Sequence, residues 1–162
     1  MDKLTFMDEV KARERQMYRI ARSYGLADAD CCDAVQEALL RAWAKRDTLR
    51  NEAAIGTWLI RILINECKTA LRKRAKTVLV AELPQHAAEV EAEADPALEQ
   101  ALFALPAKYR VPLVLNVLDG YTLREIAQML TLPEGTVKSR VSRAKKQLGT
   151  MLMQEVNGDE TY

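Results

Sequence analysis

The chain has 162 residues, of which 49% are apolar and 29% are charged, and its formal net charge is +1. This composition is typical of an ordinary soluble protein and excludes a disordered tail. No window reaches the ~18 apolar residues of a membrane span, and the charged N-terminus lacks the apolar run of a signal peptide. We therefore expect a cytoplasmic protein with one domain or two small ones.

Apolar residues recur at helical spacing along nearly the whole chain, and Gly (6) and Pro (5) are scarce. Without a long alternating run, this pattern predicts an all-α fold. Residues 81–100 carry six acidic residues and no Lys or Arg, which is typical of a flexible acidic linker. We therefore predict two small helical domains. The predicted bounds are 1–76 for the first domain, 77–97 for the linker, 98–152 for the second domain and 153–162 for a tail.

The first informative helix is predicted within residues 33–43, DAVQEALLRAW, where Val35, Leu39 and Ala42 form an inward stripe. Its polar residues lie elsewhere on the helix, where such residues are usually exposed to solvent: Asp33, Gln36, Glu37 and Arg41. Just before them, Cys31 and Cys32 are adjacent, and Cys67 is the third cysteine. Small thiols in a reducing compartment are the simplest interpretation, and a redox switch at the adjacent pair is the alternative.

A loop is predicted over residues 44–54, which have no apolar periodicity, and a two-faced helix over residues 57–74. With 100° of rotation per residue, an aromatic ring, an amide and three cations fall within an arc of about 80° on one side of this helix. They belong to Trp58, Arg61, Asn65, Lys68 and Arg72, and the opposite side carries Ile55, Leu59, Ile62, Leu63 and Ala70. A ring for unstacked bases, an amide for hydrogen bonds and charges for phosphates suit a single-stranded nucleic acid. For Trp58 alone, a position in the core is the alternative.

The sequence contains no recognisable metal-binding or catalytic motif. The three cysteines form no CxxC pair and His86 is the only histidine, so a zinc site would lack ligands. No phosphate-cradling glycine loop and no nucleophile with an adjacent base are recognisable. We therefore predict no metal, no cofactor and no enzymatic activity.

The second domain begins with apolar residues that we expect to be packing partners of the helices that follow, namely Leu98, Leu102, Leu105, Val111, Leu115 and Leu118. Thr122 and Glu125 have the spacing of a capping box and predict a helix start. Within that helix, Ile126, Ala127 and Leu130 are expected to face inward. Residues 131–133 should end it, and Pro133 suits the first turn of the next helix.

The last predicted helix is basic on its exposed side. Its buried stripe is Val137, Val141, Ala144 and Leu148, and its remaining surface carries Thr136, Lys138, Ser139, Arg140, Ser142 and Arg143. Two helices joined by a short turn, with an exposed polar and basic second helix, predict a helix-turn-helix that enters the major groove of DNA. An amphipathic helix with a solvated basic face is the alternative.

The segments DAVQEALLRAW, TWLIRILINECKTALRKR, LPAKYRVPLVL and TLREIAQMLTLPEGTVKSRVSRAKKQL, in this order, resemble a known family. They are similar to the extracytoplasmic-function sigma factors of bacterial RNA polymerase, group 4 of the sigma-70 family, which have only regions two and four. The resemblance covers roughly residues 5–150. It implies a promoter-specificity subunit whose partners are core RNA polymerase, promoter DNA and an anti-sigma factor, often one attached to the membrane.

The resemblance also implies roles for the residues already named. It places Asp33, Gln36, Glu37 and Arg41 against the clamp helices of the largest polymerase subunit. Capture of the unpaired minus-ten strand falls to Leu49, Arg50 and Asn51 of the loop with Trp58, Arg61, Asn65, Lys68 and Arg72 of the helix. Reading of the minus-thirty-five duplex falls to Thr136, Lys138, Ser139, Arg140, Ser142 and Arg143. Cys31 and Cys32 depart from the small residue and acid that the family usually has there.

Two functions other than initiation are compatible with parts of this pattern. A conventional repressor or activator would use residues 122–148 on duplex operator DNA, but it leaves the aromatic and basic side of residues 58–72 without a use. A decoy that only sequesters an anti-sigma protein has no need of Lys138, Arg140 and Arg143. The sequence therefore favours a sigma factor, with the repressor or activator as the alternative.

Overall fold

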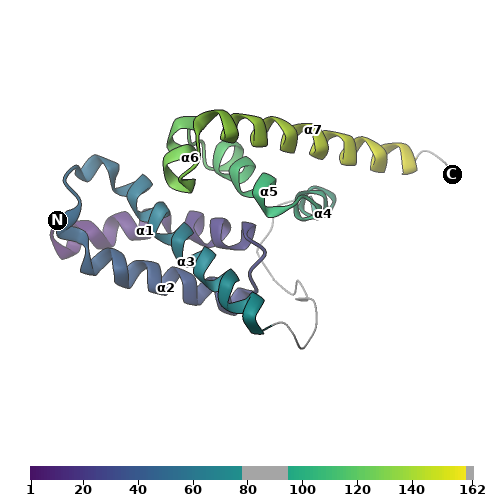
Figure 1. Cartoon of the computed structure of the whole chain (residues 1–162). Helices are drawn as coiled ribbons and strands as arrows, with labels where there is room; N and C mark the ends of the chain where they lie inside the picture. Colours follow the sequence, from purple (N-terminus) through teal and green to yellow (C-terminus); the bar gives the residue numbers. More distant parts are fainter. Residues whose placement is uncertain (78–94, 160–162) are drawn as a thin grey trace. The chain divides into compact units, whose positions relative to one another are not determined.

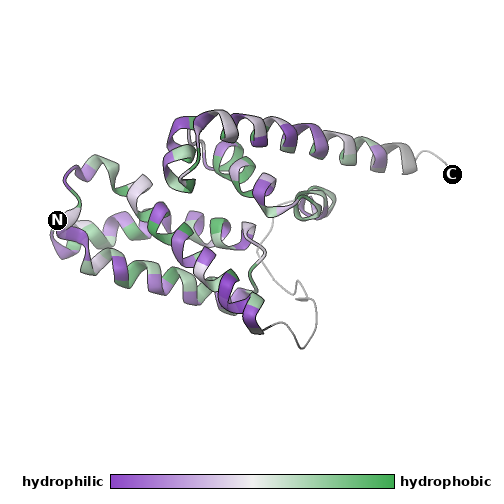
Figure 2. Ribbon diagram, viewed as in Figure 1, coloured by the Kyte–Doolittle hydropathy of each residue, from purple (hydrophilic) through white to green (hydrophobic). Residues whose placement is uncertain are grey.

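The computed structural model describes residues 1–77 and 95–159, with side chains for residues 1–76 and 95–154. Within these residues it contains seven α-helices and no strand, so the predicted all-α fold is confirmed. By their contacts the helices form two compact units. Figure 2 shows hydrophilic and hydrophobic bands alternating along the helices, as expected for amphipathic elements. Residues 78–94, which form most of the predicted acidic linker, lie outside the described residues.

The first unit is a bundle of α1 (Lys3–Ser23), α2 (Asp28–Ala44) and α3 (Ile55–Thr77), which pack on one another in antiparallel succession (Figure 1). A tight turn connects α1 to α2, where Gly25 adopts a left-handed φ of 81°. Arg74 of α3 fixes this turn because its Nη1 donates to the Gly25 carbonyl oxygen at 3.3 Å. Two short 3₁₀ turns, Arg46–Thr48 and Glu52–Ala54, form the predicted loop before α3.

The buried side of α3 differs slightly from the one predicted. Ile55, Leu59 and Leu63 are buried as expected, and the buried side is completed by Ile60, Ile64 and Cys67. Ile62 is only half-buried because it lies at the edge of this arc, and Ala70 is half-buried because it borders an open groove beside α2. On α2, Val35 and Ala42 are buried and Leu39 is half-buried.

Trp43, at the end of α2, is a packing residue of the first unit. Its ring meets the Phe6 ring edge-on, with centroids 5.2 Å apart. On the ring face, the Arg46 guanidinium carbon lies 3.9 Å from the centroid, while Arg46 Nη1 donates to the Trp43 carbonyl oxygen at 2.8 Å. An aromatic pair and a cation–π contact of this kind hold the end of α2 on α1.

The second unit contains α4 (Pro96–Ala104), α5 (Ala107–Leu113), a π-helical segment (Val114–Leu118), the first part of α6 (Leu123–Leu130), up to Ala127, and α7 (Glu134–Asp159). The Asp95 side chain caps α4 by accepting from the Ala97 N–H at 3.0 Å, and Pro96 takes the first helical position. The predicted bounds at 97/98 and 152/153 therefore fall inside α4 and α7. Leu, Met, Gln and Glu favour helix, so α7 continues past Gly149.

Two of the predicted packing residues in this unit point outward. Leu105, Val111 and Leu115 are buried and Leu102 is half-buried, but Leu98 and Leu118 are 39% and 57% exposed. Leu98 lies about 60° around α4 from the buried Ala101. The π-helical turn has more residues per turn than an α-helix, so Leu118 leaves the side on which Leu115 is buried. The prediction was therefore wrong for these two residues.

Arg110 is a buried cation that the sequence pattern did not reveal. It is 6% exposed, and its Nη1 donates to the carbonyl oxygens of Leu105 at 2.6 Å and Phe103 at 3.3 Å. Its guanidinium carbon also lies 4.9 Å from the centroid of the Phe103 ring. Burial lowers the pKa of this guanidinium. Arg110 thus satisfies carbonyl groups at the end of α4 and joins that end to α5.

The turn between α6 and α7 shows the predicted capping box. Glu125 N–H donates to Thr122 Oγ1 at 3.2 Å, and Thr122 N–H donates to Glu125 Oε2 at 2.8 Å. At the other end of α6, Thr131 has a left-handed φ of 56° and Leu132 N–H donates to the Ala127 carbonyl oxygen at 3.0 Å. Pro133 lies one residue before α7 and not in its first turn.

Thr131→Gly is expected to raise the free energy of unfolding by about 0.5–1 kcal/mol. A β-branched residue in the left-handed region costs about 1–2 kcal/mol, and the larger entropy of glycine in the unfolded chain offsets part of the gain. Urea unfolding of the full chain, followed by circular dichroism, measures the change. Gly120→Ala is the matched control, since Gly120 has φ 72° and open space around it, and should lower stability. A loss of stability in Thr131→Gly would show that the left-handed backbone of Thr131 is not strained.

Candidate polymerase and nucleic-acid interfaces

The four polar residues predicted on α2 share one exposed side of that helix. Asp33, Gln36, Glu37 and Arg41 are all exposed. Arg41 is tied to α3, because its Nε lies 2.5 Å from Oε1 of Glu66. Leu40, which sequence reasoning missed, lies in the middle of this side and is 65% exposed. Its position three residues after Glu37 and four after Gln36 is the signal that could have identified it.

Two grooves flank this side of α2. Toward α3, a groove of about 350 Å³ is lined by acids of α2, among them Asp33 and Glu37, and by Lys73 and Arg74 of α3. Toward α1, a groove of about 520 Å³ is almost wholly apolar, with Gln36 and Leu40 on its edge. The apolar groove is lined by Lys3, Phe6, Met7, Gln36, Leu39, Leu40 and Trp43. An exposed apolar surface bordered by charges is typical of a protein-binding site.

The cysteines do not support the redox alternative. Cys31 and Cys67 are buried, and burial raises the pKa of each thiol to about 12. Cys31 Sγ lies 3.5 Å from the Leu26 carbonyl oxygen, to which its thiol donates. Cys32 is exposed, so the two adjacent thiols point to different surroundings. A neutral, buried Cys31 thiol is a packing residue, since reactive cysteines have lowered pKa values and access to solvent.

The predicted aromatic and basic residues of α3 lie together on its outer side. Arg61, Asn65 and Arg72 are exposed, and Trp58 and Lys68 are half-buried, so none of the five is taken up by the core. Arg72 Nε donates to the Lys68 carbonyl oxygen at 3.4 Å, which holds its guanidinium along the helix. This side therefore combines one half-covered ring with an amide and three cations, as the sequence predicts.

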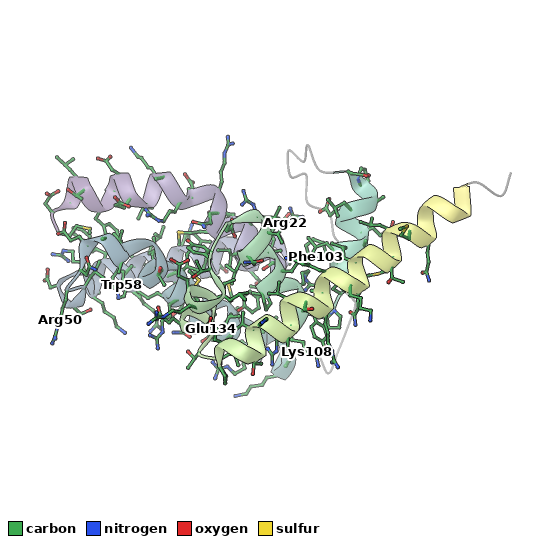
Figure 3. The ribbon with its side chains drawn as sticks, turned by 90° about the horizontal axis from the view of Figure 1, so that it is seen from above. Arg22, Arg50, Trp58, Phe103, Lys108 and Glu134 are labelled. Carbon is green, nitrogen blue, oxygen red and sulfur yellow. The ribbon has the colours of Figure 1, made fainter. Side chains whose placement is uncertain are left out.

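The loop before α3 is held by its own side chains. Asn51 Oδ1 accepts from the Ala53 N–H at 3.1 Å, and Thr48 Oγ1 donates to the Lys45 carbonyl oxygen at 2.7 Å. Leu49 is half-buried, while Arg50 and Asn51 are exposed. Figure 3 places Arg50 and Trp58 toward the same end of the first unit. The loop thus presents a polar edge at the start of the α3 surface.

The residues of α7 that were predicted to read duplex DNA divide into two groups. Thr136, Ser139, Arg140 and Arg143 line a polar pocket of about 350 Å³, with Gly135 beside them. Lys138 and Ser142 are exposed on another side of the helix, because each lies two residues, or about 160° around the helix, from Arg140. The structure therefore brings together four of the six residues predicted to read duplex DNA. The predicted stripe is confirmed at Val137, Val141 and Ala144, and Leu148 is half-buried.

Lys108 and Tyr109 of α5 complete the pocket, and sequence reasoning missed them. Arg143 Nη1 donates to Tyr109 Oη at 3.2 Å, and Lys108 Nζ lies 5.0 Å from the centroid of the Tyr109 ring. The hydrogen bond from Arg143, helped by the charge of Lys108, lowers the pKa of the Tyr109 hydroxyl. The motif LPAKYRVPLVL contains both residues, but its apolar spacing suggested packing only.

Neither a metal centre nor a membrane span emerges from the described part of the chain. No three His, Cys, Asp or Glu residues within it are placed to hold a metal ion. None of its helices is both long and apolar enough to cross a bilayer. The candidate surfaces are therefore the exposed side of α2, the outer side of α3 and the polar pocket of α7.

Comparison with known families and proteins gives matches to both units. Residues 10–77 match the family described as Sigma-70 region 2, and residues 96–148 match Sigma-70, region 4. ECF RNA polymerase sigma factor SigM of Mycobacterium tuberculosis is 36% identical over 155 residues, covering 93% of this chain and 79% of the relative. RNA polymerase sigma factor SigV of Bacillus subtilis is 31% identical over 145 residues, covering 88% of this chain and 87% of the relative.

A solved structure resembles the chain as well. The sigma factor RpoE of Bartonella quintana, crystallised with the anti-sigma factor NepR, superposes with a TM-score of 0.78 at 28% identity. The match covers 92% of this chain and 97% of that one. The two sigma-70 regions are matched in the expected order, and relatives above 30% identity are covered along most of their length. Both findings indicate the same family. The chain therefore belongs to the extracytoplasmic-function sigma factors of the sigma-70 family.

Proposed function

We propose that this chain is a sigma subunit that binds bacterial core RNA polymerase and directs promoter-specific initiation. The observation that carries the proposal is the presence of both sigma-70 regions in one chain, at residues 10–77 and 96–148. Each region presents an exposed surface with the chemistry of its task. Membership of the family and the surfaces of the two units together favour a sigma factor over a repressor or activator. A repressor or activator would leave the aromatic and basic side of α3 without a function.

In the first unit, the exposed side of α2 docks on the polymerase and the outer side of α3 captures unpaired DNA. Asp33, Gln36, Glu37 and Arg41 surround Leu40, so polar contacts would encircle an apolar centre, as in most protein interfaces. On α3, Trp58 offers a ring for stacking, Asn65 offers an amide for base edges, and the cations Arg61, Lys68 and Arg72 offer charge for phosphates. Leu49, Arg50 and Asn51 would border the captured minus-ten bases.

In the second unit, α6 and α7 read the minus-thirty-five duplex. A helix-turn-helix places the first turns of its second helix against base edges in the major groove. Thr136, Ser139 and Arg140 lie in these turns, and Lys138, Ser142 and Arg143 extend the surface around the helix. Arg and Lys bind guanine edges or phosphates, and hydroxyls bind either. Each unit alone would bind polymerase and promoter DNA with modest affinity. Because the two units are tethered, binding of the second is intramolecular once the first is bound, so the overall affinity is higher.

The acidic segment between the units and an inhibitory partner complete this proposal. Six acids within residues 81–100 suit passage through a basic channel of polymerase by resembling nucleic acid. An anti-sigma factor is proposed because the similar Bartonella protein was crystallised with one. Such a partner would cover the polymerase-facing surfaces, and it can be attached to a membrane. The sigma factor itself would act in the bacterial cytoplasm and would catalyse no reaction of its own.

Transcription reconstituted with purified core polymerase tests the proposed function. Core polymerase with the chain should start RNA at defined positions on a pool of bacterial promoter fragments, and core polymerase alone is the control. Sequencing the 5′ ends of the transcripts gives the start sites and, from them, the upstream elements. If no fragment gives a transcript that depends on the chain, while the chain alone binds a duplex operator tightly, the repressor alternative replaces the proposal.

A further inference from the structure

The pocket between α5 and α7 is built from polar and positively charged groups. Three cations line it, Lys108 from α5 with Arg140 and Arg143 from α7, and no acid is among its lining residues. Thr136, Ser139 and Tyr109 add hydroxyl groups. A pocket with this lining attracts an anion and can satisfy several of its oxygen atoms at once.

Tyr109 and Arg143 form a connected pair in this pocket. The guanidinium of Arg143 donates to Tyr109 Oη at 3.2 Å, so the hydroxyl proton of Tyr109 is available to another acceptor. An O–H group whose oxygen accepts from a cation is polarised and becomes a stronger donor. The lowered pKa of Tyr109 has the same cause. The same hydrogen bond keeps the Arg143 side chain directed toward α5.

Gly135 leaves the mouth of the pocket open. A Cβ atom built at this residue meets no other atom within 4 Å, although Gly135 borders the pocket. A larger side chain would therefore project into free space, and its cost to packing should be small. The open position allows a bulky anion, such as a phosphodiester within a duplex, to approach the first turn of α7.

We propose that this pocket seats one backbone phosphate of the duplex that α7 reads, with Lys108, Tyr109 and Arg143 as phosphate ligands. The inference rests on the proposed function and deepens it, because it removes Arg143 from the residues that read bases. Phosphate contacts carry no sequence information but set the position of a helix in the groove. Base reading by α7 is then left to the half-buried Arg140 and to exposed polar residues of that helix.

The test measures binding of the holoenzyme to a duplex that carries the upstream element of a promoter found by transcript mapping. Lys108→Ala should reduce the slope of log affinity against log salt concentration by about 0.9, since one phosphate contact is lost. Tyr109→Phe should weaken binding about tenfold, because a hydrogen bond to a charged group is lost. Gly135→Ala should weaken binding by narrowing the pocket. For each variant the loss should be equal on duplexes with altered base pairs.

Matched controls separate the pocket from general effects. Gly149→Ala changes the same residue type on the same helix, also in open space, and should leave binding unchanged. Lys11→Ala removes one exposed cation from α1 and should leave the salt slope unchanged. Thermal unfolding of each variant confirms that the fold is retained.

Two outcomes would overturn the phosphate assignment. Unchanged affinity and salt slope in all three pocket variants would show that DNA does not use the pocket. A loss confined to particular base pairs would assign the pocket to base reading. Either outcome is distinct from failure of the proposed function, because in that case the wild-type holoenzyme itself would give no promoter-dependent transcript.

Discussion

Trp58→Ala is expected to slow promoter opening about 5- to 150-fold while the chain remains folded. Stacking of one base on an aromatic ring contributes about 1–3 kcal/mol, and truncation to Ala removes that surface. Trp58 is half-buried at the start of α3, beside exposed Arg61, so part of its ring is open to a base. Stopped-flow fluorescence of 2-aminopurine placed in the minus-ten element reports opening by the holoenzyme. Binding of the upstream duplex should be unchanged, because α7 lies in the other unit.

Trp43→Ala is the matched control for this prediction. The Trp43 ring contacts Phe6 and Arg46, so its removal should lower the free energy of unfolding by about 2–4 kcal/mol. Trp58→Ala should lower the free energy of unfolding less than Trp43→Ala does. It should also slow promoter opening by more than the loss of folded protein can explain. If Trp58→Ala destabilises the chain as strongly, and opening falls only with the folded fraction, Trp58 is a core residue and the single-strand assignment is wrong.

Helical periodicity was sufficient to predict the fold and the outer side of α3. Residues that share one side of a helix are three or four apart in the sequence, so the grouping of Trp58, Arg61 and Asn65 follows from spacing alone. The capping box of α6 is equally local, because Thr122 and Glu125 bond each other across three residues. Local patterns of this kind contain their own partners, which explains why these predictions were confirmed.

Predictions failed where the backbone departs from regular geometry or where contacts are distant in sequence. The π-helical turn that exposes Leu118 is not encoded by apolar spacing, which assumes 3.6 residues per turn. Tyr109 meets Arg143 across 34 positions, so neither residue signals the other in the sequence. The buried Arg110 was missed although its partners are only five and seven residues away, because they are backbone carbonyl groups, which no residue type in the sequence marks.

Leu40 shows a third kind of failure, in which the pattern was regular but its interpretation was incomplete. When a helix is searched only for a buried apolar stripe, an apolar residue on its polar side is disregarded. Single exposed leucines are common on protein surfaces and need no explanation by themselves. Leu40 differs because it borders the apolar groove beside α1 and is surrounded by the four polar residues of α2. That setting is the one in which interface centres are found.

Leu40→Glu is accordingly expected to weaken binding to core polymerase by about 30-fold or more. A residue at the centre of an interface typically contributes about 2 kcal/mol or more, and a carboxylate buried there without a partner adds a desolvation cost. Stability should change by less than about 0.5 kcal/mol, since the side chain is 65% exposed. Competition with labelled wild-type chain for core polymerase measures the affinity.

Met153→Glu on α7 is the control for Leu40→Glu, because Met153 is 69% exposed and acquires the same charge away from α2. It should bind core polymerase within about twofold of wild type, a difference of about 0.4 kcal/mol. Leu40→Ala should lie between wild type and Leu40→Glu, since it removes apolar contact without burying a charge. Wild-type affinity in Leu40→Glu would move the polymerase contact off this side of α2. Asp33, Gln36, Glu37 and Arg41 would then be solvated surface residues, and the apolar groove beside α1 would need another partner.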